Sequence, residues 1–511
     1  MGTIQLDMFE VQLGAAILLQ MRSGDDIVRI LADGGVTRHP ASWVHDKLPK
    51  AVADFEAVDR IRLDLIIGTH YDADHLDGLV PIIEDENIDI GETWLPPVAN
   101  DATPHAAEDA PTDPHLLALQ FAKDDGDETL RSYLVHKARI CETIADLERQ
   151  VSEGPLHEMP AFLSSREFDQ PRIDEDPRGY FQQHLRSANE TLGDQEHGHA
   201  DDEITETRFP DEVPSYLYVE EGIAERQLLR RWQDNPPLAS KDIRSLAFIR
   251  KSAAKDAINA TSLHAVVKAL KDRKLPIRSA TIKDGVPRRF VWDKAERRFY
   301  PSANELSDGP VLTLLGPSDG LVKKHWDRLP VGSYLALATY ARLPVKSITT
   351  SNQLSYVVRV TLEEQNVLIC GDAGFVDFSS GRNQYHKPLI EELAPLHVVQ
   401  VAHHGGLNAH FYNALLASGY ATQTEPSYLL LSHATNDAYR PSGIFAKFVE
   451  MIRSPRRSLT VLFTATPQEP LVRDFKKLIG PVRGGAPEEC GDVRLEFGDR
   501  GWSLIQHLVQ V

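Results

Sequence analysis

Short apolar runs separated by polar residues dominate the first hundred positions. FEVQLGAAILLQ from Phe9 and DIVRILADGG from Asp26 both predict strands, because Gly and Asp interrupt the apolar pattern at their ends. RLDLIIGTH, which ends at His70, contains a continuous apolar run, and this is typical of a strand buried on both faces. A helix is expected between the last two strands, roughly from Trp43 to Ala57.

The strand pattern stops at about position 98 and resumes near position 286. Between these points the chain is acidic and contains scattered Pro and His, as in EDAPTDPH and DQEHGHADDE. Apolar residues recur at helical spacing in three stretches, 115–150, 223–232 and 257–270. We therefore expect one core that is interrupted by a mainly helical, acidic insertion. The predicted units are 1–99 and 286–511 for the two halves of the core, and 100–285 for the insertion.

Strand patterns resume in the second half and alternate with helices. The predicted strands are RRFVWD, PVLTLLG, SYVVRVTLE, NVLICGDAG, HVVQVA, SYLLLSHA, LTVLFTA and DVRLEFGDRGWSLIQH. A helix is expected near 442–452. Polar residues gather directly after strands in both halves. A layered α/β fold with a site made of loops at strand ends is the simplest arrangement that fits.

The composition excludes several classes of protein. Of the 511 residues, 42% are hydrophobic and 25% are charged, which excludes a disordered or fibrous chain. The net charge of -20 argues against broad electrostatic attraction to nucleic acid, although it permits a local basic groove. Three scattered cysteines are too few for a disulfide framework, and no apolar run approaches the roughly 20 residues that span a bilayer. We expect a cytoplasmic protein without a membrane partner, since the chain also begins without a basic leader.

The densest cluster of possible metal ligands directly follows a predicted strand. It comprises His70, Asp72, Asp74 and His75. Two imidazoles and two carboxylates on one tight loop can converge on a cation, and this mixture suits zinc and also permits manganese or iron. The alternative is a polar loop that caps the next helix, with Asp74 or Asp77 as the N-cap residue.

Two more candidate groups follow apolar runs. Asp372 comes after VLICG, while His403 and His404 come after VVQVA and precede a Gly-Gly pair that permits close backbone approach. The alternatives are a plain Gly-Asp turn and a histidine pair satisfied within the fold. We expect ligation in both places, without choosing between His403 and His404. Cys370 should be a small buried thiol and not a nucleophile.

The motifs, in this order along the chain, resemble those of the metallo-β-lactamase superfamily. HYDADHLDG resembles its His-x-His-x-Asp-His signature, with Asp72 in place of the second His. This variant resembles the nuclease-like domain of bacterial competence proteins that import DNA. Further motifs that resemble this branch are the segment from Phe9 to Leu19, LADGG, SNQLSYVVRV, NVLICGDAG and VVQVAHHGG. The resemblance covers roughly 1–97 and 286–470.

The resemblance implies a four-layer αββα sandwich that carries a metal-dependent hydrolase site. One or two ions, Zn2+ or Mn2+, would be bound by His70, Asp72, Asp74, His75, Asp372 and either His403 or His404. Asp372 would bridge the ions or bind the second one. The reaction would use a metal-activated hydroxide that Asp74 orients.

Two places depart from the family pattern. Asn352 and Ser355 stand where many members have another His, and Arg440 stands where a family stretch has His before Pro. His433 or Arg440 could act instead as a catalytic clamp on an anionic substrate. The alternative for His433 is a buried residue at a strand end. Further possible substrate contacts are Tyr71, Asn436 and Tyr439.

The sequence leaves three functions open. The first is a phosphodiesterase or nuclease, with nucleic acid or a small phosphodiester as substrate, and the basic stretches RQLLRRW and KALKDRK as a groove or as solvated helix faces. The second is a hydrolase of a small ester, lactone or phosphorylated metabolite whose pocket the insertion closes. The third is a non-enzymatic subunit that binds a protein partner through the insertion and keeps a degenerate metal site.

Overall fold

The computed structural model describes most of the predicted core. The described residues are 2–12, 14–36, 44–97, 262–263, 265–283, 285–302, 309–326, 350–381, 384–406, 408–435, 440–453, 458–467 and 491–509. Most of the predicted insertion lies outside them, at 98–261, and so do Asn436 and Tyr439. Within the described residues, no helix is long and apolar enough to cross a lipid bilayer.

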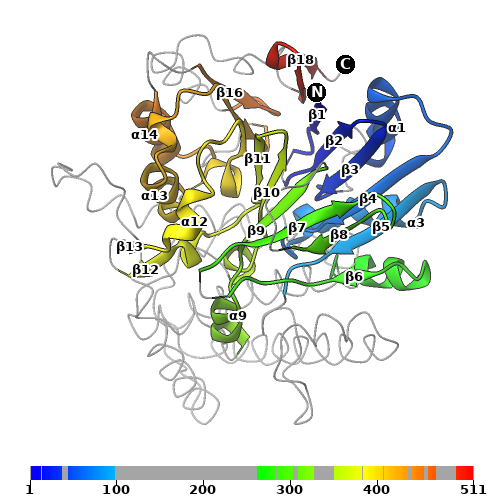
Figure 1. Cartoon of the computed structure of the whole chain (residues 1–511), viewed down its shortest axis with the longest axis horizontal. Helices are drawn as coiled ribbons and strands as arrows, with labels where there is room; N and C mark the ends of the chain where they lie inside the picture. Colours follow the sequence, from blue (N-terminus) through cyan, green and yellow to red (C-terminus); the bar gives the residue numbers. More distant parts are fainter. Residues whose placement is uncertain are drawn as a thin grey trace, which may run out of the picture.

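Two eight-stranded mixed sheets organise the described part of this α/β fold (Figure 1). The first sheet has the order β18 (Gly501–Val509), β17 (Gly491–Gly498), β1 (Thr3–Met8), β2 (Ile17–Ser23), β3 (Asp26–Ala32), β4 (Ile61–Ile67), β5 (Ile88–Trp94) and β6 (Ile277–Arg278). The second has the order β16 (Leu459–Phe463), β15 (Ser427–Leu431), β14 (Val398–Gln400), β11 (Gln365–Ile369), β10 (Val357–Leu362), β9 (Val311–Gly316), β7 (Arg288–Asp293) and β8 (Arg298–Pro301). Strands β12 (Ser379–Gly381) and β13 (Gln384–Tyr385) form a separate pair. The strand runs predicted in the second half of the chain are confirmed.

Each large sheet has a parallel part. In the first sheet β3, β4, β5 and β6 run parallel, and in the second β11, β14, β15 and β16 do so. The carboxyl ends of neighbouring parallel strands lie at the same edge of a sheet, where α/β proteins commonly bind ligands. The loops after these strands are therefore the part of the fold that positions a site.

The first sheet buries both of its faces. On β2, Ile17 and Leu19 belong to the apolar core that also contains second-sheet residues such as Val358. Leu18, between them, packs with helices on the opposite face, as the period of two in a strand requires. These helices are α1 (Val44–Phe55), α3 (Leu79–Glu84) and the helical residues 265–272. The predicted helix from Trp43 to Ala57 is thus confirmed as α1.

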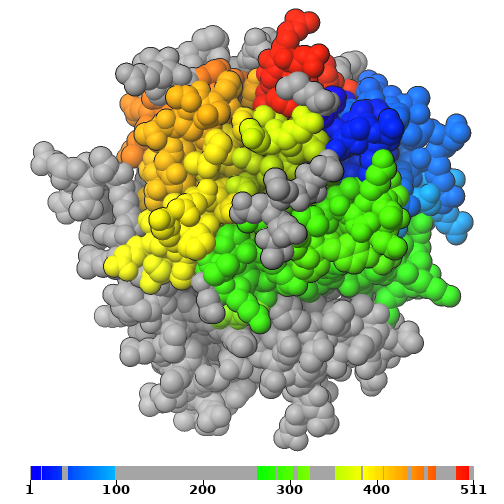
Figure 2. Space-filling view, viewed as in Figure 1, coloured from blue at the N-terminus to red at the C-terminus, as the bar shows by residue number. Residues whose placement is uncertain are grey.

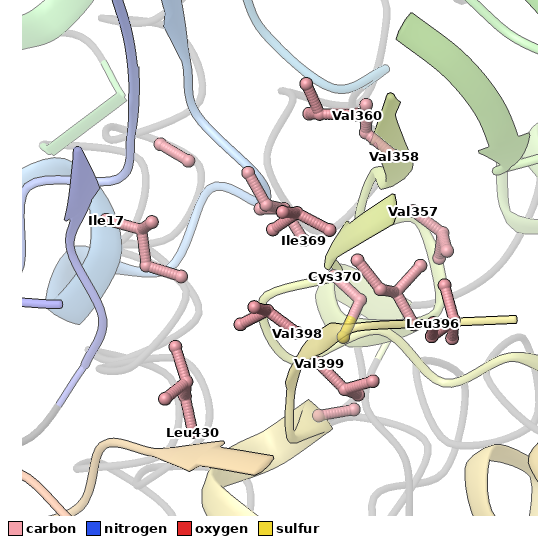
Figure 3. Packing of buried hydrophobic residues seen from close by; sticks show 14 of the residues in the cluster. Ile17, Val357, Val358, Val360, Ile369, Cys370, Leu396, Val398, Val399 and Leu430 are labelled. Carbon is pink, nitrogen blue, oxygen red and sulfur yellow. The ribbon is translucent and has the colours of Figure 1, made fainter. Parts of the chain in front are cut away.

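A large apolar core lies between the two sheets. Figure 3 shows Ile17 of the first sheet on the opposite side of this core from Ile369 and Val398 of the second. The same buried apolar cluster continues into helices α12 (Lys387–Glu391), α13 (Ala409–Ala417) and α14 (Gly443–Ile452). They lie across the molecule from α1 and α3 (Figure 1). The other described helices are α2 (Ala73–Leu76), α9 (Asp319–Trp326), α11 (Thr350–Gln353), η5 (Val376–Phe378), η6 (Ala402–Gly405) and η7 (Tyr420–Thr422).

The two ends of the chain meet in the first sheet. β1 pairs with β17, and the C-terminal hairpin of β17 and β18 lies beside the N-terminal strands (Figure 2). The stretch 265–283, which the prediction assigns to the insertion, packs on this sheet as well, since β6 pairs with β5. The division of the chain at 99 and 285 stays a prediction.

One predicted strand is only partly confirmed. FEVQLGAAILLQ is a strand from Ile17 onward, in β2, whereas its described residues before Ile17 form a loop after β1, which ends at Met8. Gly14 has a φ of +102°, and a Cβ there would lie 1.8 Å from the carbonyl oxygen of Asp74. The chain therefore turns sharply here and crosses the loop after β4 at a distance that only glycine permits.

A buried carboxylate ties the first sheet to the second. Asp64 of β4 is 0% exposed and accepts hydrogen bonds from the backbone N–H of Arg29 at 3.0 Å and from Nη2 of Arg297 at 2.8 Å. Arg297 lies in the turn between β7 and β8, and its Nη1 also donates to Asp26 at 2.8 Å. Charge-assisted hydrogen bonds thus reinforce the apolar contact between the sheets.

The substitution Asp64→Ala should lower the free energy of unfolding by about 3 kcal/mol, because it leaves a buried N–H unpaired and removes one partner of Arg297. Urea denaturation of the full chain measures this. The control is Asp89→Ala, which removes an exposed ion pair with Arg60 and should cost less than about 1 kcal/mol. Equal losses in the two variants would contradict the role of Asp64.

Candidate metal centre

Three loops that follow parallel strands bring residues of both sheets together. Residues 68–77, which we call the metal loop, follow β4 of the first sheet. Asp372 follows β11, and His403 and His404 follow β14, both in the second sheet. Gly371 and Asp372 form a turn that lies close to the metal loop. Gly371 has a φ of +48°, and a Cβ at this position would lie 2.1 Å from Thr69 Oγ1, so only glycine permits this approach.

Six of the seven predicted metal ligands come together in the described residues. Their potential ligand atoms lie within 4.8 Å of one another in three overlapping groups, which are His70, His75 and Asp372, then Asp74, His75 and His404, and finally His70, Asp72 and Asp74. Each group could hold a metal ion. The groups include His404 and not His403.

Asp372 lies at the centre of the cluster. Its Oδ1 is 3.2 Å from His404 Nε2 and 3.5 Å from His75 Nε2. The Nε2 atom of His404 is also 3.9 Å from Asp74 Oδ2, and the ring centroids of His70 and His75 are 3.8 Å apart. Ligands from the first sheet and from the second thus face the same small volume.

Several of these atoms are buried and make no hydrogen bond within the described residues. They are Nε2 of His70, His75 and His404, and Oδ1 of Asp372. A buried polar atom without a partner is costly, and buried polar atoms in native proteins are almost always paired. Three imidazole nitrogens and a carboxylate oxygen are the ligand types that zinc prefers. The donor set therefore fits a divalent cation.

Asp33, which the sequence analysis included only within the LADGG motif and without a role, orients His75. Its Oδ2 accepts hydrogen bonds from His75 Nδ1 at 2.7 Å and from Thr69 Oγ1 at 2.6 Å, and its Oδ1 accepts one from Thr69 N at 2.6 Å. A carboxylate in this position fixes the tautomer and turns the other ring nitrogen towards a metal. The sequence feature that could have identified Asp33 is its position directly after β3, the strand that runs parallel to β4.

The two adjacent histidines have different surroundings. His404 is buried, and its Nδ1 donates to the carbonyl oxygen of Ser432 at 2.6 Å, which leaves Nε2 for the cluster. His403 Nε2 instead lies 3.3 Å from Arg440 Nη2, and 4.0 Å from Asp372 Oδ2. Both residues have a left-handed backbone, with φ of 53° and 55°. The geometry therefore favours His404 as the ligand.

The electrostatics of the cluster suit a cation. Burial raises the pKa of Asp372, but the neighbouring His404 and His75 hold it well below its usual range. Burial lowers the pKa of His70, and the nearby His75 lowers it further. Burial also lowers the pKa of His404. Burial acts against the charge of His75 too, yet Asp33 and Asp372 raise its pKa well above the ordinary value. The lowered pKa values of His70 and His404 favour neutral rings that offer lone pairs beside the ionised Asp372, whereas the carboxylates next to His75 favour its charged form.

The expected catalytic residues lie at different distances from this centre. Asp74 belongs to two of the three groups, and its side chain is 20% exposed. Arg440 contacts His403. His433 is buried, with Nδ1 2.9 Å from the carbonyl oxygen of Ala434 and its ring against Phe463, and it belongs to none of the three groups.

The structure shows what the acidic residues of the metal loop and Cys370 contact. Asp72 occupies the N-cap position of α2, but its side chain makes no capping hydrogen bond, and Asp74 lies within the helix. Asp77 accepts a hydrogen bond from Ser262 Oγ at 2.5 Å. Cys370 is buried, its Sγ donates to Gln400 O at 3.1 Å, and burial raises the pKa of its thiol well above the ordinary value. The expectation of a buried thiol is confirmed.

In comparisons with models of protein families and with curated proteins, nothing matches this chain. The metallo-β-lactamase superfamily is therefore indicated only by the resemblance of the sequence motifs.

The substitution Asp33→Asn should weaken zinc binding roughly ten- to hundredfold, because an amide cannot accept from His75 and Thr69 as the carboxylate does. Competition with a chromophoric chelator on the full chain measures the affinity. Asp85→Asn is the matched control, because Asp85 pairs with His45 at 2.9 Å outside the metal groups. An unchanged affinity in Asp33→Asn would remove the proposed role of Asp33.

Proposed function

We propose that this chain is a metal-dependent hydrolase of the metallo-β-lactamase fold that acts on phosphodiesters. The observation that carries the proposal is the set of buried atoms of His70, His75, His404 and Asp372, which face one volume without hydrogen-bond partners among the described residues. Their positions after β4, β11 and β14 agree with the motifs that resemble that superfamily.

The packing of the sheets supports the four-layer αββα arrangement. The two sheets share one apolar core, α1 and α3 pack on the outer face of the first, and α13 and α14 lie on the far side of the second (Figure 1). The loops that carry the ligands would then lie at one edge of a sandwich. The mainly helical insertion remains part of the proposal, since 98–261 lie outside the described residues.

The cluster has ligands for one or two ions. The group of His70, His75 and Asp372 suits zinc, and the carboxylates Asp72 and Asp74 extend it towards manganese. A bound divalent ion supplies a Lewis acid and lowers the pKa of water towards neutrality. Asp74 is partly exposed, so its carboxylate can accept a hydrogen bond from a water that enters from solvent and can hold that water beside the ligands.

Arg440 favours an anionic substrate. Its guanidinium contacts His403 Nε2, and His403 in turn lies 4.0 Å from Asp372 Oδ2, so a fixed positive charge lies at the border of the cluster. Arginine binds phosphate oxygens with two parallel N–H groups and stays charged at all ordinary pH values. A phosphodiester, which carries one negative charge, fits this arrangement better than a neutral ester does.

The full chain with Zn2+ or Mn2+ should hydrolyse bis(p-nitrophenyl) phosphate, and chelation should abolish the reaction. Asp372→Asn should lower kcat at least about a hundredfold, because several kcal/mol of metal-derived stabilisation are lost. Asp293→Asn is the control, because Asp293 only accepts backbone hydrogen bonds in a surface turn. Single-stranded DNA and plasmid are tested in parallel. If the metal-loaded chain cleaves none of these substrates, the phosphodiesterase assignment is wrong.

Arg440→Gln should lower kcat/KM for bis(p-nitrophenyl) phosphate roughly a hundredfold, since it removes a charged donor for the phosphoryl oxygens. It should have little effect on p-nitrophenyl acetate, which is neutral. Arg500→Gln, in the exposed turn of the C-terminal hairpin, is the charge-matched control. Equal losses on both substrates would favour the small-ester alternative, or a structural role for Arg440.

A further inference from the structure

Residues 9–12 and 14–16, which we call the strap, connect the metal centre with the C-terminal hairpin. The strap follows β1, and the backbone N–H of Phe9 donates to Ala16 O at 3.0 Å, which closes it into a loop. The backbone N–H of Glu10 donates to Asp492 Oδ1 of β17 at 2.7 Å. One end of the strap is thereby fixed to the hairpin.

The strap is also tied to the segment after β15. The side chain of Gln12 accepts a hydrogen bond from the backbone N–H of Thr435 at 3.1 Å. The hydroxyl of Ser432 donates to the carbonyl oxygen of Gly14 at 2.5 Å. Both bonds link a loop of the first sheet to a loop of the second.

At Gly14 the strap touches the metal loop directly. A Cβ at this position would lie 1.8 Å from the carbonyl oxygen of Asp74 and 3.3 Å from its Cβ. The backbone of the strap therefore fixes the position from which the Asp74 side chain extends. No larger residue could do so without moving the metal loop.

Ser432 reaches the metal centre on its other side as well. Its carbonyl oxygen accepts the hydrogen bond from His404 Nδ1 at 2.6 Å. Because a carbonyl only accepts, Nδ1 carries the proton and Nε2 offers its lone pair. These contacts form a closed circuit that runs from Asp74 to Gly14, Ser432 and His404. The circuit closes where His404 Nε2 lies 3.9 Å from Asp74 Oδ2.

We propose that Ser432 is a positioning residue of the metal centre. Its carbonyl orients the ring of His404, and its hydroxyl, acting through the strap, fixes that ring relative to Asp74. The two side chains come from different sheets, so their separation depends on how the sheets are held at this edge. This inference rests on the proposed metal-dependent function.

The test compares zinc affinity in full-length Ser432→Ala, Ser432→Thr and Ser427→Ala. Ser427 is the matched control, since it is buried at the other end of β15 and bonds to Leu396 O at 3.0 Å and Tyr420 at 2.7 Å. Ser432→Ala should bind zinc at least about tenfold more weakly and should change the visible spectrum of the cobalt-loaded protein. Ser432→Thr keeps the hydroxyl and should restore both.

Ser427→Ala should lower thermal stability and leave zinc affinity and the cobalt spectrum unchanged. If Ser432→Ala behaves in the same way as Ser427→Ala, the positioning role is overturned, while zinc binding by the unaltered chain keeps the proposed function. If the unaltered chain binds no zinc, both proposals are overturned.

Gln12→Ala provides a variant at a partly exposed position, should Ser432→Ala fail to fold. It removes the second tie between the strap and the segment after β15, so it should weaken zinc binding roughly two- to tenfold. Unchanged zinc affinity in Gln12→Ala, with Ser432→Ala unfolded, would overturn the proposal.

Discussion

Three buried imidazole nitrogens and one carboxylate oxygen face the same volume without hydrogen-bond partners in the described part of the chain. Each is costly to bury without a partner, and the overlapping groups to which these atoms belong could each hold a cation. The surrounding structure holds this arrangement in place. His75 and His404 each donate through their second ring nitrogen, to Asp33 and to Ser432 respectively, so neither ring can turn away from the cluster.

The close approach of the loops depends on backbone conformation as much as on side-chain contacts. The Gly-Asp turn after β11 lies against Thr69, and Gly371 leaves the space that the Thr69 hydroxyl occupies while it donates to Asp33. Asp33 itself has a φ of 61°, a conformation that aspartate tolerates better than most residues. The ligand residue Asp372 and the orienting residue Asp33 are thus brought to His75 by two unusual turns, one in each sheet.

Local patterns were enough to predict the strands β4, β11 and β14 and the polar residues directly after them, because burial on both faces leaves a continuous apolar run. They were not enough to find the partner of His75, since Asp33 meets it only when β3 and β4 pair in parallel. The choice between His403 and His404 depends on two consecutive left-handed residues, which no periodicity describes. The break at Gly14 depends on the position of the Asp74 backbone, which is distant in sequence.

The exposed fractions of the side chains in and beside the cluster indicate the side from which a substrate would approach. His70 and His75 are completely buried, whereas the side chains of His403 and Asp74 are 16% and 20% exposed. Solvent therefore reaches the cluster from the side of Asp74 and His403. On the proposed function, a substrate would approach from this side, where Arg440 contacts His403 and the side chain of Asp74 is partly exposed. The buried side is then left to bind the ion, and the exposed side carries the groups that distinguish one substrate from another.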